Sequence, residues 1–286
     1  MSDFTFAAGF IGAGNMGGAL AQAALSAVPA DRIAVICHTP EHTRAAAARL
    51  GCPAGDSNAA LAATSRFLFL GVKPGMIGEL AAEISSSVSP GTVLVSMLAG
   101  VSLSRLEELF GADRPILRIM PNTPCAIGQG VILCAPNAHV TAEDTAEFRT
   151  LMAGAGLIDE LPEKLIDAAG TLTGCGPAFA YLFAEALADG GVACGLPRAK
   201  AQTYAAAMLR GSAAMVLETG KHPGELKDAV CSPGGTTIEG VAALERNGFR
   251  NAAIEAVRAS FGKSAKLGCS YSYTAVTGNS VTVQVF

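Results

Sequence analysis

The fold of the first half of the chain is decided by residues 9–17, which read GFIGAGNMG. This stretch satisfies Gly-x-Gly-x-x-Gly, follows an apolar run and opens an alanine-rich segment with helical spacing. In that setting Gly12 permits a tight turn, Gly14 lets the backbone approach a pyrophosphate, and Gly17 lets the helix pack near the sheet. The helix N-terminus presents free N–H groups to phosphate. The pattern predicts a dinucleotide site, and a tight structural turn is the alternative interpretation.

Strand-like and helix-like segments alternate around this loop. Near-continuous apolar runs are typical of parallel strands that are covered on both faces. The alternation predicts βαβ units and a doubly wound α/β sheet. The predicted strands span Thr5–Ile11, Arg32–Cys37, Arg66–Val72, Thr92–Met97 and Pro115–Met120, and the predicted helices span Asn15–Ser26 and Pro40–Leu50.

The second half has a different pattern, which begins near residues 159–165. Helical stretches predominate there, separated by glycine and proline. We expect helices over Pro177–Cys194, Arg198–Thr219, Glu225–Val230, Ile238–Arg246 and Arg250–Lys266, the first of them opened by Gly174–Pro177. The predicted organisation is therefore a Rossmann domain over 1–162, an all-helical domain over 163–268, and a tail of uncertain structure over 269–286.

The helical half carries alanine pairs and triplets, such as 205–207 and 213–214. Small side chains let helices approach closely but bury little area each. This composition favours a helical domain that forms half of an interwoven dimer.

Composition excludes several classes of partner. Half of the 286 residues are apolar, 15% are charged, and the net charge is −4. No basic block suits nucleic acid, and no apolar run is long enough to span a membrane. The eight cysteines form no Cys-x-x-Cys pair, so they predict buried, reduced side chains, no metal site and a cytosolic location.

The end of the second predicted strand indicates which dinucleotide binds. An acidic residue there would bind the ribose 2′-hydroxyl of NADH, but this chain has Cys37–Pro40 and no acid before Glu41. Thr39 can donate to a 2′-phosphate, and Arg44 lies one helical turn further on. We therefore expect NADPH, with NADH left open. The alternative interpretation of His38 is that it is an ordinary, solvent-exposed loop residue without a role in binding.

A second glycine cluster, Ser232–Thr237, reads SPGGTT and lies between two predicted helices. It suits a nest of backbone N–H groups before a helix, which binds a small anion such as a carboxylate. The alternative is a helix–helix turn capped by Thr236 or Thr237. In a chain that also binds a dinucleotide, the nest would supply the substrate half of a reductase.

Several segments taken together resemble the pyrroline-5-carboxylate reductase family, in order from about residue 10 to 268. They are GFIGAGNM at 9–16, VKP at 72–74, AGV at 99–101, MPNTP at 120–124, GCGPA at 174–178, GLP at 195–197, HPGELKD at 222–228 and SPGGTT at 232–237. The resemblance implies a Rossmann domain followed by a helical dimerisation domain, with dimers that often assemble into decamers. It implies reduction of 1-pyrroline-5-carboxylate to L-proline, the last step of proline biosynthesis.

The resemblance also assigns residues. Cofactor contacts are implied at Ile11, Gly12, Ala13, Gly14, Asn15, Met16, Thr39, Asn58, Gly71, Val72, Lys73, Pro74, Met97, Leu98 and Ala99. Substrate contacts are implied at Glu163, Ser232, Gly234, Gly235, Thr236 and Thr237. The chain departs from the family at Gly71, where alanine is usual, and at Ala229, where some relatives carry a cofactor-binding asparagine.

The expected chemistry is imine reduction. The Ser232–Thr237 nest would hold the substrate carboxylate, Thr237 would orient the ring nitrogen as the catalytic residue, and Glu163 would stabilise a cationic nitrogen. A 3-hydroxyacid dehydrogenase is the main rival, but it needs a lysine on the first helix of the second domain, and residues 176–181 hold none. A dinucleotide-sensing protein without turnover is the other rival, and it has no need for the nest.

Overall fold

The computed structural model describes residues 4–270, which fall into two compact units. The first, here the Rossmann unit, comprises the described residues up to Asp167 together with residues 262–270. The second, here the helical unit, runs from Ala168 to Phe261. Most of the tail predicted as uncertain, residues 271–286, lies outside the described residues.

The Rossmann unit is built on a single seven-stranded sheet in the order β2-β1-β3-β4-β5-β6-β7. All neighbouring strands are parallel except β5 and β6. A single isolated parallel bridge also joins Val35 of β2 to Ala54. The strands are β1 (Phe6–Ile11), β2 (Ile33–Ile36), β3 (Ser65–Leu70), β4 (Val93–Ser96), β5 (Ile116–Pro121), β6 (Gly130–Pro136) and β7 (Gly156–Glu160).

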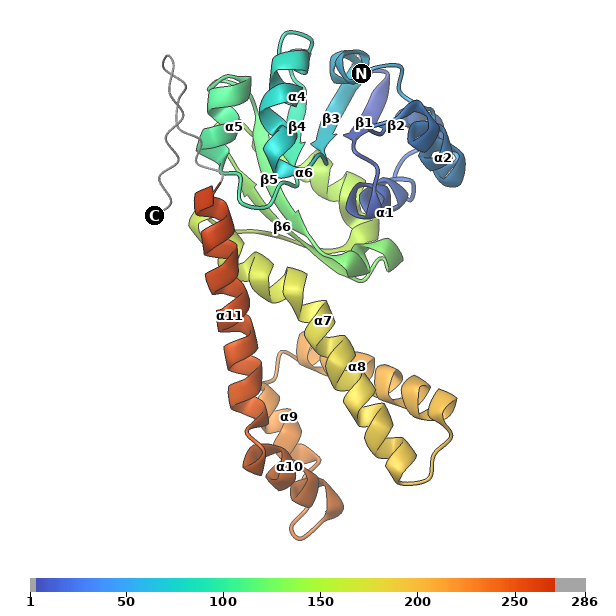
Figure 1. The fold of residues 1–286 in the computed structure, drawn as a ribbon, viewed down its shortest axis with the longest axis vertical. Helices are drawn as coiled ribbons and strands as arrows, with labels where there is room; N and C mark the ends of the chain where they lie inside the picture. Colours follow the sequence, from blue (N-terminus) through green and yellow to red (C-terminus); the bar gives the residue numbers. More distant parts are fainter. Residues whose placement is uncertain (1–3, 271–286) are drawn as a thin grey trace. The chain divides into compact units, whose positions relative to one another are not determined.

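Helices cover both faces of this sheet (Figure 1). On one face α1 contacts α2 and α6, and on the other α4 contacts α3 and α5. The two faces alternate along β1, because Phe10 packs into the cluster that includes Leu20 of α1, whereas the neighbouring Gly9 faces Leu61 of α3. The helices are α1 (Asn15–Ala24), α2 (Pro40–Leu50), α3 (Asn58–Thr64), α4 (Ile77–Ile84), α5 (Leu103–Phe110) and α6 (Ala142–Met152).

The predicted doubly wound α/β fold is confirmed, and all five predicted strands are present with ends shifted by one or two residues. The sequence analysis missed β6 and β7. β6 begins at Gly130 and ends at Pro136, and β7 is a short edge strand with an exposed, acidic end. β7 has no long apolar run, but β6 contains one at residues 131–135 (VILCA), which was a usable strand signal that the sequence analysis did not assign.

The first helix of the second half, α7 (Glu163–Ala193), corrects one prediction. It starts before Gly174–Pro177 and contains Pro177 in its interior. A proline removes one i→i−4 hydrogen bond, and this 31-residue helix continues through the loss. Pro162 and the acidic Glu163, which precede and open the first turn, were the usable start signal.

The remaining helices are α8 (Arg198–Thr219), α9 (Pro223–Ala229), α10 (Thr236–Arg246) and α11 (Phe249–Ser270). α8 has the predicted bounds and ends at a left-handed Gly220, and Pro223 occupies the first turn of α9 as expected. Within the described part of the second half there is no strand after β7, so the all-helical prediction holds there.

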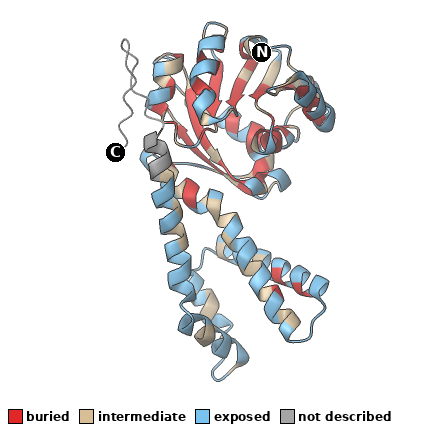
Figure 2. Ribbon diagram, in the orientation of Figure 1, coloured by how far each residue is buried: buried red, intermediate tan, exposed pale blue. Residues whose placement is uncertain are grey.

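Burial differs sharply between the units, as Figure 2 shows by colour. The sheet and its helices form an extensive buried core, which includes a stacked pair of rings, Phe10 and Phe69, with centroids 4.3 Å apart. In the helical unit the buried cluster comprises Ala188, Ala201 and Ala205.

Candidate functional site

The glycine-rich loop lies at the carboxyl ends of β1, β2 and β3. The amide of Gly12 donates to Ile36 O at 2.8 Å, and the amide of Gly71 donates to Ile11 O at 2.7 Å. Met97 follows β4, and its amide donates to Leu70 O at 3.3 Å. The structure thus brings Gly12, Gly71 and Met97, three residues predicted to contact the cofactor, side by side at one edge of the sheet. Ligands bind at this edge in open parallel sheets.

The spacing of atoms in the loop explains its glycines. Gly12 has a φ of +97°, and a Cβ there would lie 2.4 Å from Gly71 O. A Cβ on Gly17 would lie 2.1 Å from Gly12 O, whereas one on Gly14 would meet nothing within 4 Å. Gly12 and Gly17 are therefore required by packing, and Gly14 faces open space where a ligand can approach. At Gly71 a Cβ would lie 2.7 Å from Gly12 O, so here the two backbones meet directly.

A cavity of about 460 Å³ opens beside this loop. Its lining residues are Gly12, Ala13, Gly14, Cys37, His38, His42, Ala45, Ala46 and Arg49. Gly14 is the N-cap of α1 without a side-chain cap, so the first amides of the helix remain available to a phosphate. The glycine cradle, the open side of Gly14 and the helix terminus together fit a dinucleotide, which is held largely by backbone groups.

Two other predicted cofactor contacts, Thr39 and Asn58, have hydrogen-bond partners within the chain. Thr39 caps α2 by accepting from the amide of His42, and its hydroxyl lies 2.8 Å from His42 Nδ1. Asn58 donates to Glu83 at 3.0 Å. Arg44 does not line the cavity, although it was the basic residue that the sequence suggested. The structure places His38, His42 and Arg49 there instead. His38 was noted in the sequence as a loop residue, and only the helical spacing from 42 to 49 could have indicated the other two.

The segments after β3 and β4 complete the predicted cofactor edge. Lys73 is exposed and Val72 and Pro74 are half-buried, so their side chains can be reached. Leu98 is only 2% exposed, which leaves its backbone as the part able to contact a ligand. Ala99 is exposed beside it.

The second glycine cluster forms a tight turn at the start of α10. The amide of Gly235 donates to Ser232 O at 3.0 Å, and Gly234 has a φ of +66°. Gly235 is the N-cap and contributes no side-chain cap, so Thr236 and Thr237 are the first two helical residues. The alternative in which either threonine caps the helix is therefore wrong. Thr236 and Thr237 are exposed, and the first amides of an 11-residue helix lie beside their hydroxyls.

Glu163 has partners that the sequence did not reveal. Its Oε1 accepts from the amide of Leu103 at 2.6 Å and from Arg118 Nη1 at 3.1 Å. Arg118 is 3% exposed and also pairs with Asp167, while its Nε has no hydrogen-bond partner among the described residues. Glu163 thus binds the N-terminus of α5 and a buried guanidinium. Contact with a substrate nitrogen stays a prediction, and both of these bonds use the same carboxylate oxygen, Oε1.

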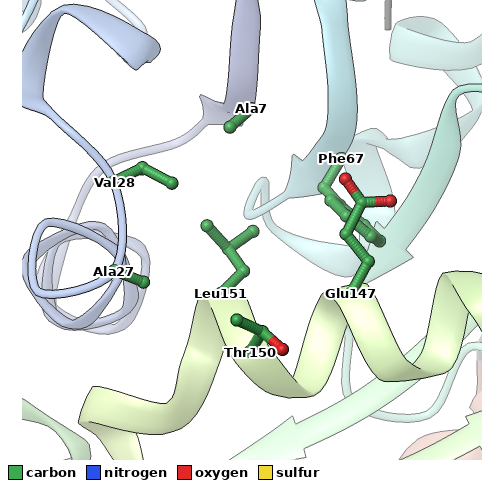
Figure 3. A pocket seen from close by; sticks show the side chains of 7 residues that line it. All are labelled: Ala7, Ala27, Val28, Phe67, Glu147, Thr150 and Leu151. Atoms are coloured by element: carbon green, nitrogen blue, oxygen red, sulfur yellow. The ribbon is translucent and has the colours of Figure 1, made fainter. Parts of the chain in front are cut away.

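A smaller cavity, of about 190 Å³, lies on the opposite edge of the sheet. Figure 3 shows Ala7 of β1 and Phe67 of β3 facing Glu147 and Leu151 of α6. Both strand residues are near the amino ends of their strands, away from the glycine loop. Glu147 there is paired with Arg66 at 2.8 Å. This cavity therefore lies apart from the glycine-rich loop and the cavity beside it.

The cysteines of the described residues differ in their exposure. The seven cysteines with described side chains are unpaired, and Cys52, Cys125 and Cys134 are buried as expected. Burial raises the pKa of Cys134 to about 12. Cys194 is exposed, so the expectation that all cysteines are buried was wrong. Neither a metal-binding cluster nor a helix capable of crossing a membrane occurs in residues 4–270.

The chain resembles known proteins along nearly its whole length. Residues 163–267 match the model described as pyrroline-5-carboxylate reductase dimerisation, and residues 7–100 match the one described as NADP oxidoreductase coenzyme F420-dependent. The pyrroline-5-carboxylate reductase of Escherichia coli is 43% identical over 261 residues, which cover 91% of this chain and 97% of that protein.

Two solved structures agree with these matches. The pyrroline carboxylate reductase of Plasmodium falciparum, whose structure has NADP bound, aligns with a TM-score of 0.82 and 32% identity over 93% of this chain and 100% of that one. The 1-pyrroline-5-carboxylate reductase of Streptococcus pyogenes gives a TM-score of 0.80 and 33% identity over 90% of this chain and 97% of that one. With its glycine cradle, its helix-terminal nest and these relatives, the chain belongs to the pyrroline-5-carboxylate reductase family.

Proposed function

We propose that the protein reduces 1-pyrroline-5-carboxylate to L-proline, the last step of proline biosynthesis, with NADPH as the preferred cofactor. When bound, the cofactor supplies the hydride for the C=N bond. The single observation that carries this proposal is the chain's possession of two anion cradles, the loop at 12–17 and the turn at 232–237. One fits a dinucleotide pyrophosphate and the other a small carboxylate.

The residues of the Rossmann unit hold the cofactor. The amides that open α1 bind the pyrophosphate, and Gly14 leaves the space it needs. The strand-end segments at 71–74 and 97–99 line the same edge and position the reactive half of the dinucleotide. Val72 and Pro74 are half-buried apolar side chains at that edge, and they exclude water from it.

The turn at 232–237 holds the substrate. Its amides and the hydroxyls of Ser232 and Thr236 bind the carboxylate, and Thr237 donates to or accepts from the ring nitrogen so that the C=N bond is fixed in one orientation. A threonine hydroxyl is a poor general acid on its own, so we assign Thr237 to orientation rather than to protonation. The ring nitrogen takes its proton from solvent, and hydride addition to the imine carbon then gives the amine of proline.

The helical unit forms a homodimer in this proposal. Its single-chain form leaves large apolar side chains exposed, among them Tyr181, Leu182 and Leu217 at 64%, 67% and 79%. Apolar surface of this extent is typical of an interface. In the dimer, the helical unit of one protomer completes the site of its neighbour. Assembly into decamers and a cytosolic location stay predictions.

The direct test is oxidation of NADPH and of NADH by the purified protein with racemic pyrroline-5-carboxylate, with proline identified as product. We expect wild-type turnover and a loss of about 100-fold in kcat/KM for Thr237→Ala, as for removal of one positioned donor. The matched control is Thr203→Ala, since Thr203 lies on α8 and bonds only to Ala199 O of its own helix.

Each outcome has a distinct meaning. Turnover that survives Thr237→Ala would retain the reaction but contradict the role of Thr237. Tight nucleotide binding without turnover with either cofactor would contradict the reductase proposal and favour a sensor.

A further inference from the structure

One face of α2 forms a wall of the cofactor cavity. The lining residues His42, Ala45, Ala46 and Arg49 are spaced i, i+3, i+4 and i+7, which places them in one row along the helix. The two alanines leave space, and the two ends of the row carry the imidazole and the guanidinium. From His42 to Arg49 the helix rises about 10 Å, so the wall spans the width of a nucleotide.

The guanidinium of Arg49 reaches across to the first turn of α1. Its Nη2 lies 2.7 Å from the position that a Cβ on Gly18 would take, so the end of this side chain occupies the space that the glycine leaves open. Within the described residues, Arg49 has neither an ion pair nor a hydrogen bond. By contrast, Arg66, Arg114 and Arg118 of the same unit all have partners. Arg49 is thus an available cation held over the dinucleotide loop.

The cavity lining holds one cationic side chain, Arg49, and two histidines, His38 and His42. None of the lining residues is acidic. A carboxylate at this place would bind a ribose 2′-hydroxyl and repel a phosphate. The lining, next to Ala13 and Gly14 and to the end of β2, therefore suits a phosphate on the adenosine ribose.

We propose that Arg49, on the third turn of α2, binds the 2′-phosphate of NADPH across the cavity and sets the preference for NADPH over NADH. Gly18 makes this possible by leaving the space through which the side chain passes. His42, whose Nδ1 lies 2.8 Å from the Thr39 hydroxyl, is at the other end of the row, about 10 Å along the helix from Arg49. The proposal rests on the proposed use of a dinucleotide cofactor but concerns which phosphate this chain recognises.

The test is direct binding to the full-length protein, measured by isothermal titration calorimetry with NADPH, NADH and 2′,5′-ADP. We expect Arg49→Gln to weaken NADPH and 2′,5′-ADP by about 10- to 100-fold, as for a lost hydrogen bond to a charged group, and to change NADH by less than about 2-fold. Arg44→Gln is the matched control, because Arg44 lies on the same helix but not in the cavity lining, and all three affinities should persist.

A second variant tests the same wall without removing Arg49. Ala45→Glu places a carboxylate in the row, and we expect it to weaken NADPH while leaving NADH binding in place. Since Ala45 is exposed on the helix surface, the variant should fold.

The proposal is overturned if Arg49→Gln leaves NADPH binding unchanged, or if it weakens NADPH and NADH equally, because the latter would assign Arg49 to the pyrophosphate. A wild-type protein that binds neither dinucleotide would instead refute the proposed function.

Discussion

The two units of this chain achieve stability in different ways. The Rossmann unit closes around its own core, with Phe10, Phe67, Phe69 and Phe148 each at 1% exposure or less. The helical unit buries a cluster of three alanines and holds one notable ring contact, between Phe183 and Phe249 at 5.1 Å. Alanine contributes little buried area, and this is why we propose a partner surface for the helical unit and none for the Rossmann unit.

The two anion cradles also differ in how many contacts hold them. In the Rossmann unit, three strand ends hold the glycine loop, and a Cβ at Gly12 or Gly17 would collide with backbone. In the helical unit the Ser232–Thr237 turn is exposed and held by one local hydrogen bond, from Gly235 to Ser232. The first cradle is therefore fixed by contacts between several elements of its unit, and the second by a hydrogen bond within its own turn.

We expect the largest effect from a substitution on the exposed apolar surface of the helical unit, where it would change dimerisation. Leu217→Glu should weaken dimerisation by at least about 100-fold, because it would place an unpaired carboxylate in an apolar interface. Analytical ultracentrifugation over a concentration series measures this. Leu157→Glu is the control, since Leu157 is 58% exposed but lies on β7 of the Rossmann unit. Dissociation by Leu157→Glu but not by Leu217→Glu would reverse our assignment of the interface.

We expect a smaller effect, on the free energy of unfolding, from substitutions within the glycine loop. Gly17→Ala should lower the free energy of unfolding by about 2 kcal/mol, since its Cβ would lie 2.1 Å from Gly12 O. Gly14→Ala should change it by less than about 0.5 kcal/mol, because that Cβ meets nothing within 4 Å, yet it should weaken NADPH binding. Urea unfolding and calorimetry separate the two outcomes. Equal destabilisation by both variants would show that the loop is not preformed as described.

The smallest effect concerns an ion pair of the Rossmann unit and its pH dependence. Burial alone would raise the pKa of Asp144, but hydrogen bonds from Arg66 and Thr141 outweigh it and lower the pKa below its ordinary value. Asp144 also completes the capping box of α6 with Thr141. Asp144→Asn should therefore cost about 1–2 kcal/mol at neutral pH.

The sign of the pH effect follows from the lowered pKa. The stabilisation from Asp144 is fully present above its unfolded-state pKa of about 4 and disappears as the pH falls through the folded-state value. The difference between wild type and Asp144→Asn should thus shrink in unfolding curves recorded below about pH 4. Glu143→Gln, on the same turn but exposed, is the control. A difference that grows in acid would contradict the assignment.

Much of this protein is determined by its sequence alone. The loop at 9–17, the five central strands, the bounds of α8 and the turn at 232–237 all depend on residues close together in the chain, and each was predicted from local pattern. A glycine spacing or an apolar run has its effect within one element, so it can be interpreted without the fold.

Only the tertiary structure decided the rest. Arg49 rather than Arg44 reaches the cofactor cavity because α2 packs beside α1, where Gly18 leaves room. Glu163 bonds Arg118, 45 residues earlier in the chain, and β6 gains its place by antiparallel pairing with β5. Such contacts join residues that are distant in sequence. Their formation depends on how elements pack against one another, and no local pattern encodes that packing.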